Sequence, residues 1–155
     1  MNSSADHVKL QPTTHMRGED DDETSELRTM LDDARRYIQS FAWCAGIEEE
    51  LFGLGIGGVV AVFLFRIRPA GAIDEWLWVI AGDLPSAYLV TDRAASPVQA
   101  LEVYCELMES WIRAVRQGGN LRDVFPVAAA PTSANADLLE KRIVFLRKKT
   151  IPTFA

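Results

Sequence analysis

The chain has 155 residues and a net charge of −6, and 48% of its residues are hydrophobic. This length suits one domain with a buried core. The acidic pI near 4.9 argues against a nucleic-acid partner, because phosphate recognition needs a concentrated basic patch.

The acidity is concentrated at the start of the chain. Residues 1–25 hold six carboxylates and two basic side chains, which accounts for four of the six net negative charges. The first 23 residues also lack apolar periodicity and end in an acidic run. We therefore predict a disordered acidic tail over 1–23 and a single folded domain over 24–155.

Apolar residues at helical spacing predict a first helix over about 24–45, capped by Thr24 or Ser25 and ended by Gly46. Its predicted buried face comprises Leu27, Met30, Leu31, Ala34, Ile38, Phe41 and Ala42. Glutamates 48–50 follow. Adjacent carboxylates rarely converge on a cation without further ligands, so we expect a solvated loop there rather than a cation site.

Residues 51–65 are uncharged but too few for a membrane-spanning helix, which needs about 20 apolar residues. Membrane association through this segment is therefore a disfavoured hypothesis. β-Branched residues predict a strand over 58–68, whereas 51–57 could be loop, helix or strand. The strand alternates between Val59, Ala61, Phe63, Phe65 and Ile67 on one face and Val60, Val62, Leu64 and Arg66 on the other. Both faces are mostly apolar, so both need a cover.

Two shorter strands are predicted next, over 76–81 and 87–90, joined by a turn at 82–86. Trp76, Trp78 and Ile80 share one face of the first of them. With the strand before them, these segments predict a three-stranded antiparallel meander.

Two helices complete the predicted order α-β-β-β-α-α, an α+β fold. Ser96, Pro97 and Gln99 form a capping box for the first, which should end at Gly118. The second starts near Thr132 or Ser133 and stops before Pro152, because proline cannot continue the backbone hydrogen bonding of a helix.

Few patterns point to chemistry. Gly53, Gly55 and Gly58 match a dinucleotide-binding spacing, but no strand is predicted before them and no helix after them, so we interpret them as a strand entry. His7 and His15 lie in the predicted tail and there is no Cys-x-x-Cys pair, so we expect no metal and no cofactor.

The two cysteines, Cys44 and Cys105, lie on apolar helical faces, which indicates free core thiols. The chain begins without the charged segment and apolar run of a signal peptide, so a cytoplasmic location is expected.

The candidate site lies around the predicted turn. Trp76 and Trp78 could line an aromatic pocket or simply pack in the core. Asp83 and Ser86 flank the turn, where an aspartate commonly bonds its own backbone, and no core histidine is available to make Asp83 catalytic. Together with Tyr88, these residues are our candidate ligand-binding set.

The series Trp78, Gly82-Asp83-Leu84-Pro85, Tyr88 and Ser96-Pro97 resembles an uncharacterised bacterial family, a domain of unknown function. The resemblance covers roughly residues 70–115. It departs from the family at Leu77, which separates two tryptophans that are adjacent in the family pattern. The resemblance implies a bacterial cytosolic domain and assigns no catalytic residue.

The sequence therefore favours a non-catalytic module that binds protein or associates with itself, with a possible immunity or regulatory role. The apolar strand at Val59–Phe65 is the reason, because three helices need not cover both of its faces. The alternative is a small-ligand-binding protein or an enzyme with a pocket at the Trp76–Tyr88 sheet edge.

Overall fold

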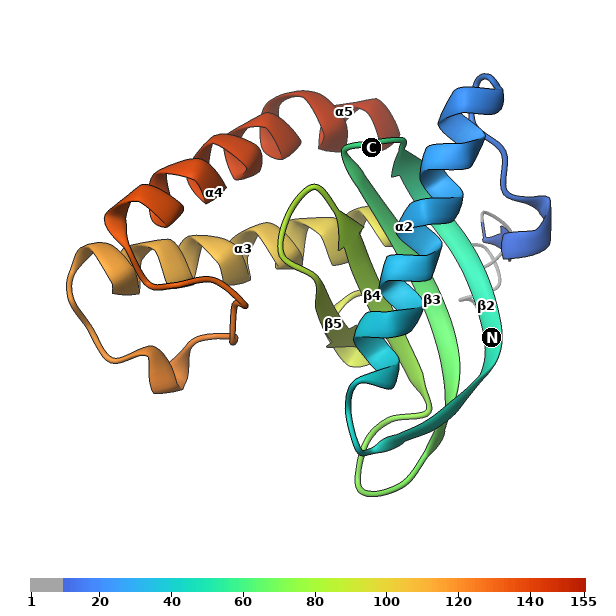
Figure 1. Cartoon of the computed structure of the whole chain (residues 1–155), viewed down its shortest axis with the longest axis horizontal. Coiled ribbons are helices and arrows are strands. Elements are labelled where there is room, and N and C mark those ends of the chain that lie inside the picture. The colour runs from blue at the N-terminus through green and yellow to red at the C-terminus, as the bar shows by residue number, and fades with distance from the viewer. Residues whose placement is uncertain (1–9) are drawn as a thin grey trace. The chain divides into compact units, whose positions relative to one another are not determined.

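The computed structural model describes residues 10–155; the predicted tail before Leu10 lies outside the described residues. The described chain divides into two compact units, with the division between Ala100 and Leu101. The first contains a sheet and a long helix, and the second is helical (Figure 1). The single domain over 24–155 stays a prediction.

The sheet has five antiparallel strands in the order β1-β2-β3-β4-β5. The strands are β1 (Gln11–Pro12), β2 (Cys44–Ile56), β3 (Val60–Pro69), β4 (Trp76–Gly82) and β5 (Ala87–Val90). The α+β class is confirmed. The predicted meander corresponds to β3, β4 and β5, and two further strands precede it along the chain.

The largest difference from the sequence prediction is β2. Residues 44–50 are part of this strand, and the glutamates 48–50 lie within it rather than in a loop. Three register shifts, between Cys44 and Ile47, between Ile47 and Glu49, and between Phe52 and Leu54, interrupt its pairing with β3. Bulges break the strict alternation that marks a strand in sequence, and charged residues are common near sheet edges. Of residues 51–57, whose state the sequence left open, residues 51–56 belong to this strand and Gly57 begins the turn to β3.

Helix α2 (Asp21–Gln39) starts earlier and ends earlier than predicted. Asp20 is the N-cap: its carboxylate accepts a 2.8 Å hydrogen bond from the Glu23 amide, and the Glu19 amide donates to Glu23 at 2.6 Å. The acidic run assigned to the tail therefore forms the first turn, where carboxylates suit the helix dipole. Before it, residues 11–15 form β1 and a 3-10 turn, η1 (Thr13–His15), so residues 10–23 are structured.

The core of the first unit lies between α2 and one face of the sheet (Figure 1). The predicted helix positions that are buried there are Leu27, Met30, Leu31, Ala34 and Ile38. From β3, the core includes Ala61, Phe63, Phe65 and Ile67, as the predicted alternation requires. Phe41 packs at the margin of this core but lies beyond the end of the helix.

The connection from β5 contains a 3-10 turn, η2 (Thr91–Arg93), and leads into α3 (Pro97–Arg116). The predicted capping box is present: the Gln99 amide donates to Ser96 Oγ at 3.2 Å, and the Ala95 amide donates to Gln99 Oε1 at 2.8 Å. Gly118 follows the helix with a φ of 63°.

The second unit continues through a 3-10 turn, η3 (Leu121–Asp123), into α4 (Ser133–Phe145). Thr132 caps α4 as predicted and accepts from the Asn135 amide at 3.2 Å. The helix does not stop before Pro152. It passes through a π turn, η4 (Leu146–Thr150), into α5 (Ile151–Phe154). The wider π turn comes just before Pro152, which has no backbone N–H to donate, so the chain continues as a helix past the proline.

Candidate functional site

Two register rows run across the sheet on the face opposite α2. The first row pairs Glu49 with Arg66 and Arg66 with Trp76. The second row joins, in order across four strands, Leu51, Leu64, Trp78 and Leu89. Residues that lie opposite one another in such rows share a face of the sheet. On this face, therefore, the first row, which is charged and aromatic, lies next to the second row, which is apolar.

The other members of these rows besides Arg66 and Leu89 form the floor of a cavity of about 510 Å³, here called the tryptophan cavity. Its lining residues all belong to the first unit: Glu49, Leu51, Leu64, Trp76, Trp78, Thr91, Ala94 and Ala95. Leu64 and Trp78 are each only 3% exposed, whereas Leu51 and Trp76 are half-buried. The cavity therefore has a deep apolar side and a more accessible side at Trp76.

The wall of the tryptophan cavity is the connection between β5 and α3, which contributes Thr91, Ala94 and Ala95. The indole N–H of Trp78 donates a 2.9 Å hydrogen bond to the backbone carbonyl of Ala94. This bond satisfies the one polar atom of a buried tryptophan and fixes the wall against the floor. Trp78 is also part of the cavity lining.

Charged groups surround the accessible end of the tryptophan cavity. The Arg66 guanidinium carbon lies 5.9 Å from the centre of the Trp76 ring, within cation–π range. Arg66 also donates to Glu49 and to Glu75, and both distances are 3.4 Å. Hydrogen bonds of this length are weak, and the side chains of Glu49 and Glu75 are 45% and 53% exposed.

The cavity brings together two of the five predicted site residues, Trp76 and Trp78. Tyr88 lies on the other face of the sheet, where it packs against Phe41 and Trp43 with ring centroids 5.3 Å and 5.1 Å apart. Asp83 and Ser86 belong to the β4–β5 connection and do not line the cavity; the Asp83 amide donates to Val59 O at 3.0 Å.

Six lining residues were not identified from the sequence: Glu49, Leu51, Leu64, Thr91, Ala94 and Ala95. Three of them are strand residues that face the same way as Trp76 and Trp78, and alternation within each strand would reveal that face. The pairing between strands, and hence their closeness, depends on the β2 register, which the bulges conceal.

The glycine pattern has a structural explanation. Gly53 lies in β2, where an added Cβ would come within 2.7 Å of Pro97 Cγ and 3.0 Å of the Val62 carbonyl oxygen. Only glycine allows the start of α3 to approach the strand this closely. Gly58 lies in the β2–β3 turn, so no helix follows the motif, as a dinucleotide site would require.

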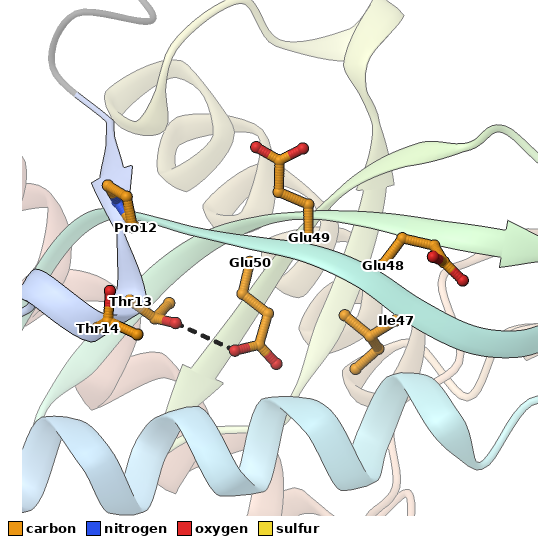
Figure 2. Close-up of a pocket in the computed structure, with 7 residues that line it drawn as sticks. All are labelled: Pro12, Thr13, Thr14, Ile47, Glu48, Glu49 and Glu50. Carbon is orange, nitrogen blue, oxygen red and sulfur yellow. Dashed lines mark hydrogen bonds between the residues drawn. The ribbon is translucent and has the colours of Figure 1, made fainter.

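A second cavity, of about 270 Å³, lies beside β2 and is here called the Glu50 cavity (Figure 2). It is lined by Pro12, Thr13, Thr14, Ile47, Glu48, Glu49 and Glu50. Figure 2 shows the Glu50 side chain directed toward α2 and the Glu49 side chain directed away from it. The Thr13 hydroxyl donates to Glu50 Oε1 at 3.0 Å.

Each of the three adjacent glutamates has its own arginine partner. Glu48 accepts from Arg68 at 2.5 Å, Glu49 from Arg66 at 3.4 Å, and Glu50 from Arg35 through two hydrogen bonds of 2.6 Å and 2.7 Å. Their carboxylates are therefore directed to different arginines rather than to one point. Within residues 10–155, no group of three acidic, histidine or cysteine side chains is placed to hold a metal ion.

The Arg35–Glu50 pair joins α2 to β2, and Thr13 adds η1 to the same contact. Burial by itself raises the pKa of Glu50, but the hydrogen bonds and charge of Arg35, with the Thr13 hydroxyl, lower it below its ordinary value of 4.5. The Glu50 side chain is only 18% exposed, so its carboxylate is better shielded from solvent than those of Glu48 and Glu49.

We expect the stabilising contribution of Glu50 to be lost in acid. Because its folded pKa is lowered, the contribution is complete above the unfolded value of 4.5 and disappears as the pH falls through the folded pKa. At about pH 7 the melting temperature of the wild type should exceed that of Glu50→Gln, and this difference should become smaller as the pH is lowered to about 3. Thermal unfolding followed by circular dichroism measures this difference. Glu26→Gln, an exposed change, is the control; a constant gap between wild type and Glu50→Gln would contradict the assignment.

Both cysteines are free: Cys105 is buried on α3 as predicted, whereas Cys44 is half-buried at the start of β2, and its predicted helical position is wrong because α2 ends at Gln39. Burial raises the pKa of the Cys105 thiol to about 12, which leaves it protonated and unreactive near neutral pH. In the described part of the chain, no helix combines the length and apolar character needed to cross a membrane.

The fold and the cavities define the chain as an α+β protein with an open, five-stranded antiparallel sheet and an aromatic cavity on the face opposite its long helix. No protein family matches the chain, and no curated protein or solved structure shows significant similarity to it. Its function is therefore argued from the geometry alone.

Proposed function

We propose that this protein binds a small, largely apolar molecule in the tryptophan cavity without catalysing a reaction. The observation that carries the proposal is a cavity of about 510 Å³ with two tryptophans and two leucines in its lining. Small-molecule sites typically occupy about 300–1,000 Å³ and combine an apolar lining with a few polar groups. Here the polar groups are the Glu49 carboxylate and the Thr91 hydroxyl.

The chemistry of the lining supports binding over catalysis. Its described side chains include neither a histidine nor a cysteine, and the one carboxylate, Glu49, is already paired with Arg66. General acid–base catalysis needs a group whose proton affinity is tuned to the reaction, usually with a second group to orient it. A bacterial, cytoplasmic setting remains a proposal from the family resemblance.

Filling the cavity should abolish binding. Ala95 is an exposed residue of the wall, so Ala95→Trp places an indole in the tryptophan cavity without removing a core side chain. We expect the wild type, but not Ala95→Trp, to bind phenylpropanol, with saturable shifts of the Trp76 and Trp78 indole N–H signals in NMR spectra. Ala70→Trp is the matched control, because Ala70 is exposed and lies outside the cavity. Equal binding by all three proteins, or none by the wild type, would refute the proposal.

A second candidate function is self-association through α4. Residues 60–65 of β3 are all buried, so the exposed apolar strand face that suggested self-association from the sequence is absent. Instead, the large hydrophobic side chains that are exposed within residues 10–155 all lie on one helix: Leu138, Val144 and Phe145 are 51%, 44% and 48% exposed.

A second copy is the occupant that fits this α4 surface, because Leu138 and Phe145 are seven residues apart and therefore share one face of the helix. Two copies related by a two-fold axis would bury these side chains against each other. The acidic residues of α4 do not direct this contact, since Asp137 and Glu140 both accept hydrogen bonds from Arg116 of the same chain.

Sedimentation velocity tests self-association. The wild type should show concentration-dependent dimerisation in the micromolar range that Phe145→Ser abolishes. The control Thr153→Ser, at another exposed helical position, should behave as the wild type does. A wild type that remains monomeric at high micromolar concentration would contradict this candidate.

A further inference from the structure

The tryptophan cavity has a chemical polarity that its apolar floor does not explain. Its inner side is formed by Leu64 and Trp78, whereas Glu49 of β2 and Trp76 of β4 lie at its accessible end, on either side of Arg66 of β3 in the register row. A carboxylate and an aromatic ring that flank one position both attract a positive charge there, because the ring face and the carboxylate are electron-rich.

The protein already places a cation at this end. The Arg66 guanidinium lies over Trp76 at 5.9 Å and contacts Glu49 and Glu75 at 3.4 Å. Two carboxylates share one guanidinium, so the group carries a net charge of −1. Since both hydrogen bonds are long and the Arg66 side chain is 35% exposed, this internal cation is held weakly.

From this arrangement we infer that the ligand of the tryptophan cavity is an amphipathic amine or quaternary ammonium compound. Its apolar body packs against Leu51, Leu64 and Trp78, and its cationic nitrogen lies between the Glu49 carboxylate and the Trp76 ring. The inference rests on the proposed function, because it specifies the ligand class of the same cavity.

An anionic head group fits this end poorly. Arg66 is the cation of this group, and it donates hydrogen bonds to both carboxylates, Glu49 and Glu75. An anion that approached Arg66 would be repelled by two carboxylates. An ammonium group would instead be attracted by the net negative charge of Glu49, Glu75 and Arg66, and it would replace or share the contact of Arg66 with Glu49.

Three probes with the same phenylpropyl body test the inference: phenylpropyl-trimethylammonium, phenylpropanol and phenylpropanoate. We expect the ammonium compound to bind about tenfold more tightly than the alcohol, because it adds one cation–π contact and one exposed ion pair. The carboxylate should bind most weakly. Isothermal titration calorimetry gives the affinities, and the indole N–H signals of Trp76 and Trp78 locate the probe.

Two variants separate the charge effect from folding. Glu49→Gln should remove the preference for the ammonium probe, so the ratio of ammonium to alcohol affinity falls from about tenfold to about one. Arg66→Gln removes the competing internal cation, so it should raise the ammonium affinity. Glu48→Gln is the matched control, since Glu48 is adjacent in β2 but pairs with Arg68 and does not line the tryptophan cavity.

The outcomes distinguish this inference from the proposed function. If all three probes bind equally, or if Glu49→Gln leaves the ammonium preference intact, the cavity is a ligand site but the inference is wrong. Tighter binding of phenylpropanoate would also overturn the inference. If the folded wild type binds none of the probes, the proposed function fails and the inference fails with it.

Discussion

Phe63→Ala should lower the free energy of unfolding by about 4 kcal/mol, because it removes a phenyl ring from the fully enclosed centre of the first unit. Phe63 is 0% exposed, and its ring centroid lies 6.0 Å from that of Phe52 and 5.8 Å from that of Phe65. Neighbouring rings on a hydrogen-bonded sheet cannot collapse far, so most of the vacated volume should remain as a cavity.

Urea unfolding followed by tryptophan fluorescence measures this loss. Trp111 lies in the second unit, so a Trp111→Phe background leaves Trp43, Trp76 and Trp78 as reporters of the first unit. Phe63→Leu, which retains most of the apolar volume, is the control and should cost about 1.5 kcal/mol. A loss below about 1 kcal/mol for Phe63→Ala would mean that Phe63 is not enclosed as described.

Gly82→Ala should cost about 3 kcal/mol, because both the backbone conformation and the available space exclude a side chain. Gly82 has a φ of 148°, and an added Cβ would overlap the Val59 carbonyl oxygen and lie 2.9 Å from Val60 Cα. Both atoms belong to the backbone, so the end of β4 would have to separate from the β2–β3 turn.

Gly118→Ala separates the two causes. Gly118 also has a positive φ, 63°, but nothing lies within 4 Å of its added Cβ. It should therefore cost only about 1 kcal/mol, the conformational part alone. Urea unfolding followed by circular dichroism, which reports both units, compares the variants; equal losses for Gly82→Ala and Gly118→Ala would show that the close backbone approach at Gly82 has no energetic effect.

The sequence predicted the elements whose signals are local. The 3.6-residue spacing identified the buried face of α2 from Leu27 to Ile38, and the capping residues located the starts of α3 and α4 at Ser96 and Thr132. Alternation identified the two faces of β3 before its partners were known. These features depend on neighbouring residues only, so a single sequence contains them.

The prediction was wrong where the structure of a charged segment depends on contacts with residues that are distant in the sequence. Acidic residues 19–23 were predicted to lie in a tail, yet Asp20 caps α2 and Glu23 accepts a hydrogen bond from the Gly57 amide at 3.0 Å. Glutamates 48–50 read as a loop, yet the arginines that pair with them come from α2 and β3. A charged residue indicates a solvent-exposed loop or tail only when no partner group compensates its charge. Here the partner groups are far away in the sequence.

The candidate site shows the same division. The sequence by itself determined that Trp76 and Trp78 share a face, because residues two apart on a strand always do. Only the tertiary structure decided that Tyr88 lies on the opposite face and that Glu49, Leu64 and Ala94 complete the cavity. That outcome depends on strand register, which a single bulged residue shifts and which is fixed by contacts between segments that are distant along the chain.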